Sequence, residues 1–98
     1  MRIINNPYFS KELKDILQYI ANDKPSASIK FKNELKENIK SIIDNPYMYP
    51  PSQYFNDKDV RDMTYKKYTV VYQVNLNRNT IEIMKIFNRN KPSREESK

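Results

Sequence analysis

The segment formed by residues 60–89 constrains the fold more than any other part of the chain. Within residues 68–74 almost every side chain is β-branched or aromatic, and the sequence alternates with the period of two that is typical of a β-strand. Both faces of this strand carry apolar side chains, which indicates a central place in a sheet. Residues 60–64 and 81–87 have a similar composition, and only short turns separate them from the middle strand. The sequence therefore predicts an antiparallel meander of three strands.

The length and charge of the chain limit the kinds of protein it can be. Ninety-eight residues bury one core, so we expect a single domain. The chain has 18 Lys and Arg residues against 12 Asp and Glu residues, which gives a formal net charge of +6. This excess of positive charge favours an anionic partner, either a nucleic acid or an acidic protein, although it can also serve solubility alone.

The amino acids that are missing exclude several kinds of site. The chain has no Cys and no His, which excludes disulfide bonds, thiolate or imidazole metal sites, and Ser-His-Asp catalysis. It has no Gly, so it cannot form a glycine-rich phosphate-binding loop. We therefore expect neither a metal nor a small-molecule cofactor. The N-terminus lacks the apolar core of a signal peptide and no segment is apolar for long enough to span a membrane, so we expect a cytoplasmic protein.

The first half of the chain predicts a short strand followed by a helix. Residues 2–5 form a candidate strand that is too short to be stable alone and should pair with the meander. Ser10 is a candidate N-cap for a first helix that ends near Ala21. The apolar stripe of this helix has the i, i+3, i+4, i+7 spacing of an amphipathic helix and consists of Leu13, Ile16, Leu17 and Ile20.

A second, longer helix is predicted from Pro25 to the Asn45-Pro46 pair. Its core stripe consists of Ala27, Phe31, Leu35, Ile39 and Ile42. Ile29 and Ile43 lie off this stripe. The link between the helices is so short that they must run antiparallel, and we expect this hairpin to pack by one side against the sheet. A line of basic residues at i, i+4 spacing also follows the second helix, as either a solvated face or a binding stripe, and consists of Lys32, Lys36 and Lys40.

The remaining segments are predicted to be loops and a tail. Residues 45–59 contain three Pro and three Tyr without helical periodicity, so we expect an ordered loop whose aromatic side chains cover an edge of the core. In the absence of Gly, Asn residues are expected at turn positions with positive φ, and residues 75–79 are interpreted as a hairpin loop. Residues 92–98 are interpreted as a flexible C-terminal tail that follows a single domain of residues 1–91.

In this order of elements the chain resembles the RelE/ParE superfamily of bacterial toxins from type II toxin–antitoxin pairs. The resemblance rests on the hairpin sequence YFSKELKDILQYIANDKPSASIKFKNEL, on the Asn-Pro pair that closes the second helix, and on VRDMTYKKYTVVYQV followed by TIEIMKIFNR. It implies an α+β fold, in which a short N-terminal strand and an antiparallel helical hairpin pack on a mainly antiparallel four-stranded sheet. Two positions depart from the pattern. Lys67 stands where many members have Gly, and residues 87–89 stand where many have His.

One activity that the resemblance implies is RNA cleavage. RelE-like members cut messenger RNA on the ribosome with the adjacent 2′-hydroxyl as nucleophile, and this reaction needs a base, an acid and positive charge beside the phosphorane. On this interpretation the chain is a metal-independent endoribonuclease. Its candidate catalytic residues are Arg61 and Arg89 for charge stabilisation, Lys66 or Lys67 for phosphate binding or as the base, and Tyr72 as the acid. The alternative is that Tyr72 packs in the core and that the two lysines are solvated turn residues.

The other implied activity is inhibition of DNA gyrase by protein contact, as in ParE-like members. The absence of His, the long second helix and the extended loop before Arg61 favour this branch. A plain nucleic-acid-binding module is a third alternative from charge alone, but the chain lacks a recognised reader motif with exposed aromatic residues. We therefore predict a ParE-like toxin that inhibits growth and stabilises plasmids.

The resemblance also implies partners for the chain. These are a cognate antitoxin and a target, which is DNA gyrase or else the ribosome with its messenger RNA. Arg61 should either contact the target or lie at the edge of the sheet beside a carboxylate such as Asp62 or Asp59.

Overall fold

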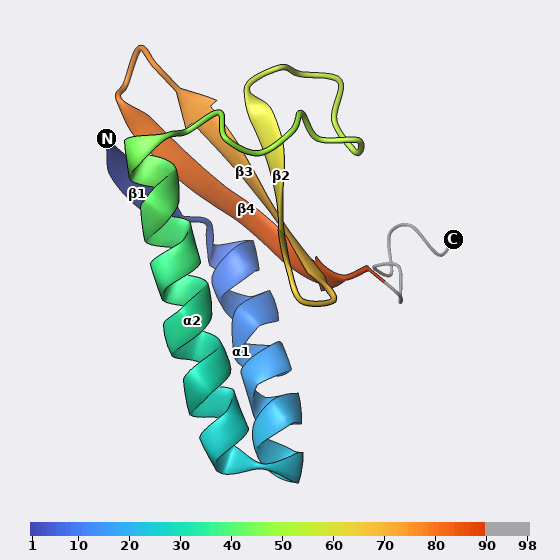
Figure 1. The fold of residues 1–98 in the computed structure, drawn as a ribbon. Coiled ribbons are helices and arrows are strands. Elements are labelled where there is room, and N and C mark those ends of the chain that lie inside the picture. The colour runs from blue at the N-terminus through green and yellow to red at the C-terminus, as the bar shows by residue number, and fades with distance from the viewer. Residues whose placement is uncertain (90–98) are drawn as a thin grey trace.

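A four-stranded sheet lies against a pair of antiparallel helices in the computed structural model, which describes residues 1–89 (Figure 1). The elements in chain order are β1 (Arg2–Asn5), α1 (Pro7–Asp23), α2 (Pro25–Asp44), β2 (Val60–Tyr65), β3 (Tyr68–Asn75) and β4 (Thr80–Asn88). This arrangement confirms the predicted α+β fold. The predicted tail, residues 92–98, lies outside the described residues.

The sheet has the strand order β1-β4-β3-β2, in which β1 is parallel to β4 and the other two pairs are antiparallel. The meander therefore forms as predicted, and residues 2–5 pair with it. β3 lies between β4 and β2, and its side chains from Tyr68 to Tyr72 are buried on both faces. A register shift between Val71 and Tyr72 marks a β-bulge against β4. The central place predicted for this strand is confirmed.

The N-cap of α1 is Asn6, so the prediction of Ser10 is wrong. The Asn6 side-chain oxygen accepts a hydrogen bond from the Tyr8 amide at 2.8 Å. Pro7 occupies the first helical position, where its missing N–H is not needed. Ser10 consequently lies within the helix and is exposed to solvent.

Lys24 alone separates the two helices, which run antiparallel beside each other (Figure 1). α1 continues to Asp23, past the predicted end near Ala21. The buried apolar members of the predicted α2 stripe are Phe31, Leu35 and Ile42. Ile29, which the periodicity places off that stripe, keeps 63% of its surface exposed. Among the described residues, no helix is both long and apolar enough to span a membrane.

Apolar clusters form on both faces of the sheet. The larger one lies between the sheet and the helices, and the smaller one consists of Val60, Val71 and Phe87 with Met84 packed against them. The Tyr54 ring meets the Phe87 ring edge-on, with 5.1 Å between the centroids. Tyr47 and Tyr49 pack against the larger cluster. The aromatic residues of the loop before β2 therefore cover the core, as predicted.

Two residues within the described range adopt positive φ, Lys66 at 53° and Asn79 at 56°. Asn79 ends the turn between β3 and β4, which confirms the role expected of Asn in that loop. Lys66 was not expected in this conformation. It begins the two-residue turn between β2 and β3, and the favoured turns of such tight hairpins need a positive φ at their first position.

Candidate functional site

The basic residues predicted for the site meet at one end of the sheet, where the β2–β3 turn lies beside the end of β4. Lys66 and Lys67 form the turn. The Arg89 backbone N–H donates to the Lys67 carbonyl at 2.7 Å, and the Arg89 guanidinium donates to the Lys66 carbonyl. These bonds tie the turn to the residue that follows β4, so three positively charged residues are held together. We call Lys66, Lys67 and Arg89 the basic turn.

Glu34 of α2 reaches the same end of the sheet. It accepts a hydrogen bond from the Tyr65 hydroxyl, and the Lys66 ammonium lies 3.7 Å from its Oε1 atom. The bond from Tyr65 lowers the pKa of Glu34, while burial and then the same bond raise the pKa of Tyr65 to about 12. Lys66 also lies 5.5 Å from the centre of the Tyr65 ring. Lys66 therefore interacts with Glu34 and Tyr65 of the protein itself, and both turn lysines are exposed to solvent.

Arg61 lies apart from the basic turn, near the other end of β2. At about 3.3 Å per residue it is roughly 17 Å along the strand from Lys66. Its guanidinium donates to the carbonyl oxygens of Lys58 and Tyr49, both at 3.0 Å, and lies 4.8 Å from the centre of the Tyr47 ring. Within residues 1–89 its partners are thus loop carbonyls and an aromatic ring. No ion pair joins Arg61 to Asp59 or Asp62 within these residues, because the preceding loop folds back onto β2 and brings its backbone carbonyls to the guanidinium.

The two carboxylates expected beside Arg61 have other partners in the same loop. Asp59 accepts a hydrogen bond from the Tyr47 hydroxyl at 2.7 Å, and this bond raises the pKa of Tyr47. Asp62 is buried on β2 and accepts a bond from the Gln53 amide at 3.0 Å. Arg61 and its neighbours therefore hold the loop of residues 45–59 against the edge of the sheet.

Tyr72 lies within the larger apolar cluster with none of its surface exposed. Its hydroxyl donates to the Pro46 carbonyl at 2.6 Å, just after the end of α2. Burial raises the pKa of this phenol to about 12. Tyr72 is the partner of Arg61 in the β2–β3 ladder, so it too lies away from the basic turn.

The chain matches the protein-family model of the ParE toxin of the type II toxin–antitoxin system parDE over residues 3–92. It belongs to the ParE toxin family. No curated protein matches the chain in sequence. The family assignment confirms the resemblance to the RelE/ParE superfamily that the sequence indicates.

Solved structures share the fold of this ParE-family chain. One is described as the chromosomal ParDE TA system from P. aeruginosa, with a TM-score of 0.72 and 19% identical residues over 90% of this chain and 95% of that chain. Another is the isolated E. coli RelE toxin, with a TM-score of 0.67 and 14% identical residues over 98% of this chain and 90% of that chain. Because the ParDE and RelE structures share this fold, the likeness alone does not distinguish a ParE-like from a RelE-like activity.

The basic turn of the ParE-family chain has the charge to bind an anion. Glu34 lies beside Lys66, and its carboxylate is hydrogen-bonded to the Tyr65 hydroxyl. Within residues 1–89 no group of three or more acidic, His or Cys side chains could hold a metal ion. The five residues predicted for catalysis fall into two sets: Lys66, Lys67 and Arg89 in the basic turn, and Arg61 with Tyr72 farther along the sheet.

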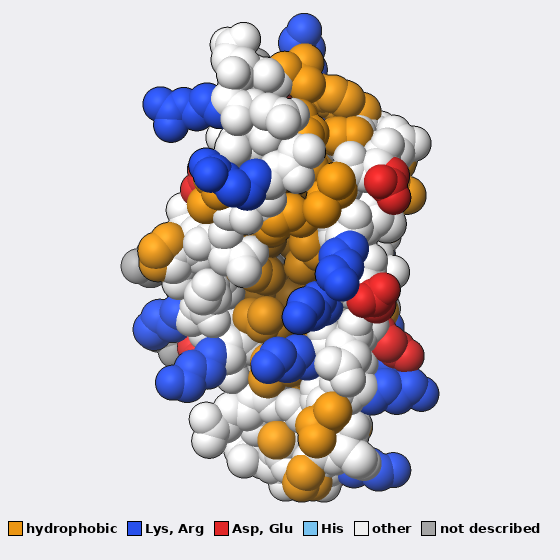
Figure 2. Space-filling model, turned by 90° about the vertical axis from the view of Figure 1, so that its left-hand side faces the viewer, with side chains coloured by type: hydrophobic (Ala, Val, Ile, Leu, Met, Phe, Trp, Pro, Cys, Tyr) orange, Lys and Arg blue, Asp and Glu red, His pale blue; other side chains and the backbone are white. Residues whose placement is uncertain are grey.

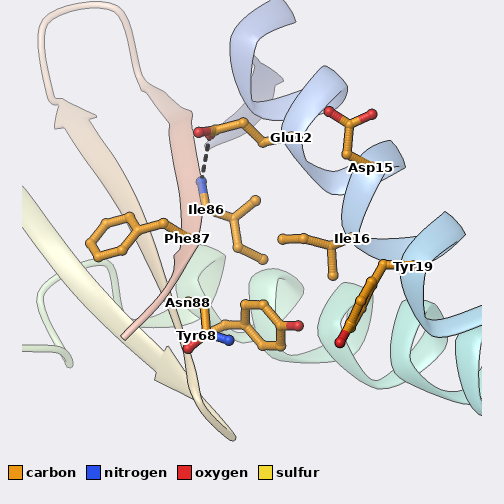
Figure 3. Close-up of a pocket in the computed structure, with 8 residues that line it drawn as sticks. All are labelled: Glu12, Asp15, Ile16, Tyr19, Tyr68, Ile86, Phe87 and Asn88. Carbon is orange, nitrogen blue, oxygen red and sulfur yellow. Dashed lines mark hydrogen bonds between the residues drawn. The ribbon is translucent and has the colours of Figure 1, made fainter. Parts of the chain in front are cut away.

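A cleft beside the basic turn contains residues that the sequence patterns do not indicate (Figure 3). Its lining consists of Glu12, Asp15, Ile16, Tyr19, Tyr68, Ile86, Phe87 and Asn88. Glu12 Oε1 accepts a hydrogen bond from the Ile86 amide at 3.0 Å, which joins α1 to β4. Figure 3 shows the Tyr19 and Tyr68 hydroxyl groups lying toward each other across the cleft, and burial raises the pKa of Tyr68. The alternation of β3 and the stripe of α1 indicate Tyr68 and Ile16, but nothing local indicates that Glu12 bonds to a strand.

Proposed function

We propose that this chain is the toxin of a type II toxin–antitoxin pair and that it inhibits DNA gyrase by protein contact. The observation that supports contact over RNA cleavage is the state of Tyr72. The phenol that would donate the proton to a leaving oxygen is fully buried and already donates to the Pro46 carbonyl. Its pKa of about 12 also makes it a weaker acid than an ordinary phenol.

The surroundings of the other candidate residues support the same conclusion. Arg61 donates to the Lys58 and Tyr49 carbonyls, which favours a role in holding the loop over a role in binding a phosphate. The chain has no His that could replace Tyr72 as acid or base. What the basic turn offers is an exposed, positively charged surface, which suits contact with an acidic protein face.

A toxin of this kind needs a cognate antitoxin, which we propose as the second partner of the chain. Family membership and the formal net charge of +6 both favour an acidic protein in this role. Antitoxin segments that fold as they bind can wrap a small domain such as this one.

The test uses the purified chain in two assays. We expect it to stop gyrase from supercoiling relaxed plasmid DNA and to leave messenger RNA intact on translating ribosomes. Cleavage of messenger RNA that depends on the ribosome, without any effect on supercoiling, would overturn the proposal.

The second candidate is a RelE-like nuclease, and one feature favours it. The basic turn gathers Lys66, Lys67 and Arg89 at one end of the sheet, where they could hold RNA phosphates. What speaks against it is that the carboxyl and phenol groups beside Lys66, those of Glu34 and Tyr65, are already hydrogen-bonded to each other. The same two assays separate this candidate from the first.

A further inference from the structure

The cleft between α1 and the end of the sheet where β3 begins and β4 ends has acidic side chains on one side and tyrosines on the other (Figure 3). An apolar floor of two isoleucines lies between them. From one side to the other the lining includes Glu12 and Asp15, Ile16 and Ile86, and Tyr19 and Tyr68. The volume of about 340 Å³ is within the usual range of binding pockets. We call this surface the tyrosine cleft.

The negative charge of the tyrosine cleft contrasts with the positive charge of the whole chain. The formal net charge is +6, and Figure 2 shows basic side chains spread over the face of the molecule that carries β1 and α2. The lining of the cleft contains Glu12 and Asp15 but no Lys or Arg. Asp15 is exposed and takes part in none of the ion pairs within residues 1–89. Charge complementarity therefore favours a cationic ligand in this cleft.

The Tyr68 hydroxyl offers this ligand a hydrogen bond. Tyr68 keeps only 6% of its surface exposed, and its ring meets the Phe31 ring edge-on with 5.2 Å between the centroids. Within residues 1–89 its hydroxyl has no hydrogen-bond partner, and Figure 3 shows it lying toward Tyr19 in the cleft. Burial raises the pKa of this phenol, so it keeps its proton at neutral pH and can donate. Buried hydroxyls are normally hydrogen-bonded, which makes this one a position where a ligand atom can bond.

The tyrosine side of the cleft adjoins the basic turn. A second hollow of about 430 Å³ shares Tyr19 and Tyr68 with the cleft and is also lined by Lys66 and Lys67. The order along this end of the molecule is therefore acidic, aromatic and basic. A segment that crosses it needs a cationic group beside α1 and an anionic group beside the turn. A protein can present both groups, whereas a nucleic acid backbone presents only negative charge.

We infer that the tyrosine cleft binds an arginine side chain of the protein that the toxin inhibits, with its guanidinium at the two carboxylates and its apolar stem over the isoleucine floor. The Tyr68 hydroxyl donates to a backbone carbonyl of the same segment, and a nearby acidic side chain of that segment meets Lys67. Arginine suits the cleft better than lysine, because its planar guanidinium bonds carboxylates in a fixed geometry and stacks on tyrosine rings. This inference rests on the proposed function in one respect, because it assigns the arginine to gyrase.

The first test measures binding of a small probe to the purified, nitrogen-15-labelled chain by nuclear magnetic resonance. The probe is Nα-acetyl-arginine amide, and its matched control is Nα-acetyl-citrulline amide, which has nearly the same shape without the charge. We expect saturable shifts of the Ile86 and Asn88 amide signals, with a dissociation constant on the order of 1 mM for so small a ligand. The citrulline probe should bind about fivefold more weakly or less, and added salt should weaken only the arginine probe.

Single substitutions locate the probe in the cleft. Asp15→Asn removes one charge of the acidic side, and Asp23→Asn is its matched control at an exposed position of the same helix outside the cleft. Tyr68→Phe removes the hydroxyl and keeps the ring, with Tyr8→Phe outside the cleft as its control. We expect Asp15→Asn and Tyr68→Phe each to weaken the arginine probe by about threefold or more. Both controls should bind it within about 1.5-fold of the parent.

The second test asks whether the cleft contacts gyrase. The same four variants, each confirmed as folded by circular dichroism, are titrated in the supercoiling assay. We expect Asp15→Asn and Tyr68→Phe to raise the concentration that gives half inhibition by about threefold or more, and the two controls to match the parent. If the parent binds the arginine probe but does not inhibit gyrase, the cleft stands and the proposed function fails. If the parent inhibits gyrase and both cleft variants inhibit it equally well, the assignment of the arginine to gyrase fails.

Four other outcomes would overturn the inference. One is equal binding of the arginine and citrulline probes, and another is an equal loss of binding in Asp15→Asn and Asp23→Asn. A third is binding of the probe only after Lys91→Ala and Arg94→Ala, which would make the basic residues of this chain the occupant. The last is conversion of a dimer to a monomer by the probe in sedimentation, which would make a second copy of the chain the occupant.

Discussion

At the scale of single residues, Arg61 and Tyr72 are partners across the β2–β3 ladder, and both direct their donors to the chain that follows α2. Tyr72 bonds to the Pro46 carbonyl from inside the core, and Arg61 bonds to the Tyr49 carbonyl from the strand edge. A buried donor without an acceptor costs about 1–3 kcal/mol, so the fully buried Tyr72 hydroxyl fixes the path of the loop. The half-buried Arg61 adds two bonds to carbonyls of the same loop. The positions of Arg61 and Tyr72, two of the candidate nuclease residues, are therefore explained by their bonds to the loop that follows α2.

Replacing Tyr72 by Phe tests this explanation through stability. At neutral pH we expect the variant to lose about 1 kcal/mol, because the Pro46 carbonyl loses its donor while the ring still packs. The phenol has a pKa of about 12 in the folded chain and about 10 in the unfolded chain. Its contribution is therefore complete below about pH 10 and is lost as the pH rises to about 12. Urea denaturation across this pH range should show that the free energy of unfolding falls more steeply with pH for the parent than for Tyr72→Phe. An equal fall of the free energy of unfolding in both proteins would show that the Tyr72 hydroxyl is not held by the Pro46 carbonyl.

At the scale of elements, local patterns predict the strands and the helical stripes but not every boundary. The alternation in residues 68–74 and the α2 stripe depend only on nearby residues, and both are confirmed. The start of α1 was predicted wrongly because Ser10 and Asn6 are both good N-cap residues. Asn6 is also held by a bond from its Nδ2 to Glu82 Oε2 at 2.8 Å, on a strand far along the chain. A contact of that kind follows from the pairing of β1 with β4, which the local pattern around Asn6 does not contain.

The two candidate caps of α1 can be compared directly. Asn6→Ala removes the acceptor for the Tyr8 amide and the bond to Glu82, so we expect a loss of about 1–2 kcal/mol in the free energy of unfolding. Ser10→Ala is its matched control, because it alters an exposed position within the helix and should change stability by less than about 0.5 kcal/mol. Chemical denaturation of both variants gives the two values. A larger loss in Ser10→Ala than in Asn6→Ala would mean that the helix begins where the sequence alone suggested.

At the scale of the whole molecule, topology explains which part of the site the sequence could predict. A meander places the β2–β3 turn beside the end of β4, so the meeting of Lys66, Lys67 and Arg89 follows once the strands are recognised. Glu34 and Tyr65 are different, because their contact depends on how the helical hairpin lies across the sheet. The apolar groove between β1 and the two helices, which the α2 lysines Lys32, Lys36 and Lys40 line, depends on the same packing. Sequence patterns predict the lysine row of α2, but only the packed structure places apolar surface and an open strand edge beside it.

The nature of the target is also a property of the whole molecule, since its net charge of +6 attracts RNA and acidic proteins alike. Lys67→Ala distinguishes these targets through salt dependence. The substitution removes an exposed charge of the basic turn and keeps the backbone carbonyl that accepts from Arg89. If RNA were bound there, the slope of log affinity against log salt should fall by about one unit, while Lys14→Ala on α1 should change it little.

For a gyrase-directed toxin we expect a different set of results. The effect of Lys67→Ala on inhibition of gyrase should depend much less on salt concentration than an effect on RNA binding would. Tyr72→Phe should still arrest growth and inhibit supercoiling, because a protein contact needs no proton from a buried phenol. The measurements are plasmid supercoiling at several salt concentrations and growth after induction, with circular dichroism to confirm that each variant is folded. Ribosome-dependent cleavage of messenger RNA by the parent, lost in a folded Tyr72→Phe protein, would decide for RNA cleavage. The phenol would then have to leave the Pro46 carbonyl and reach a phosphate held by the basic turn, and a rearrangement of the core would become part of the mechanism.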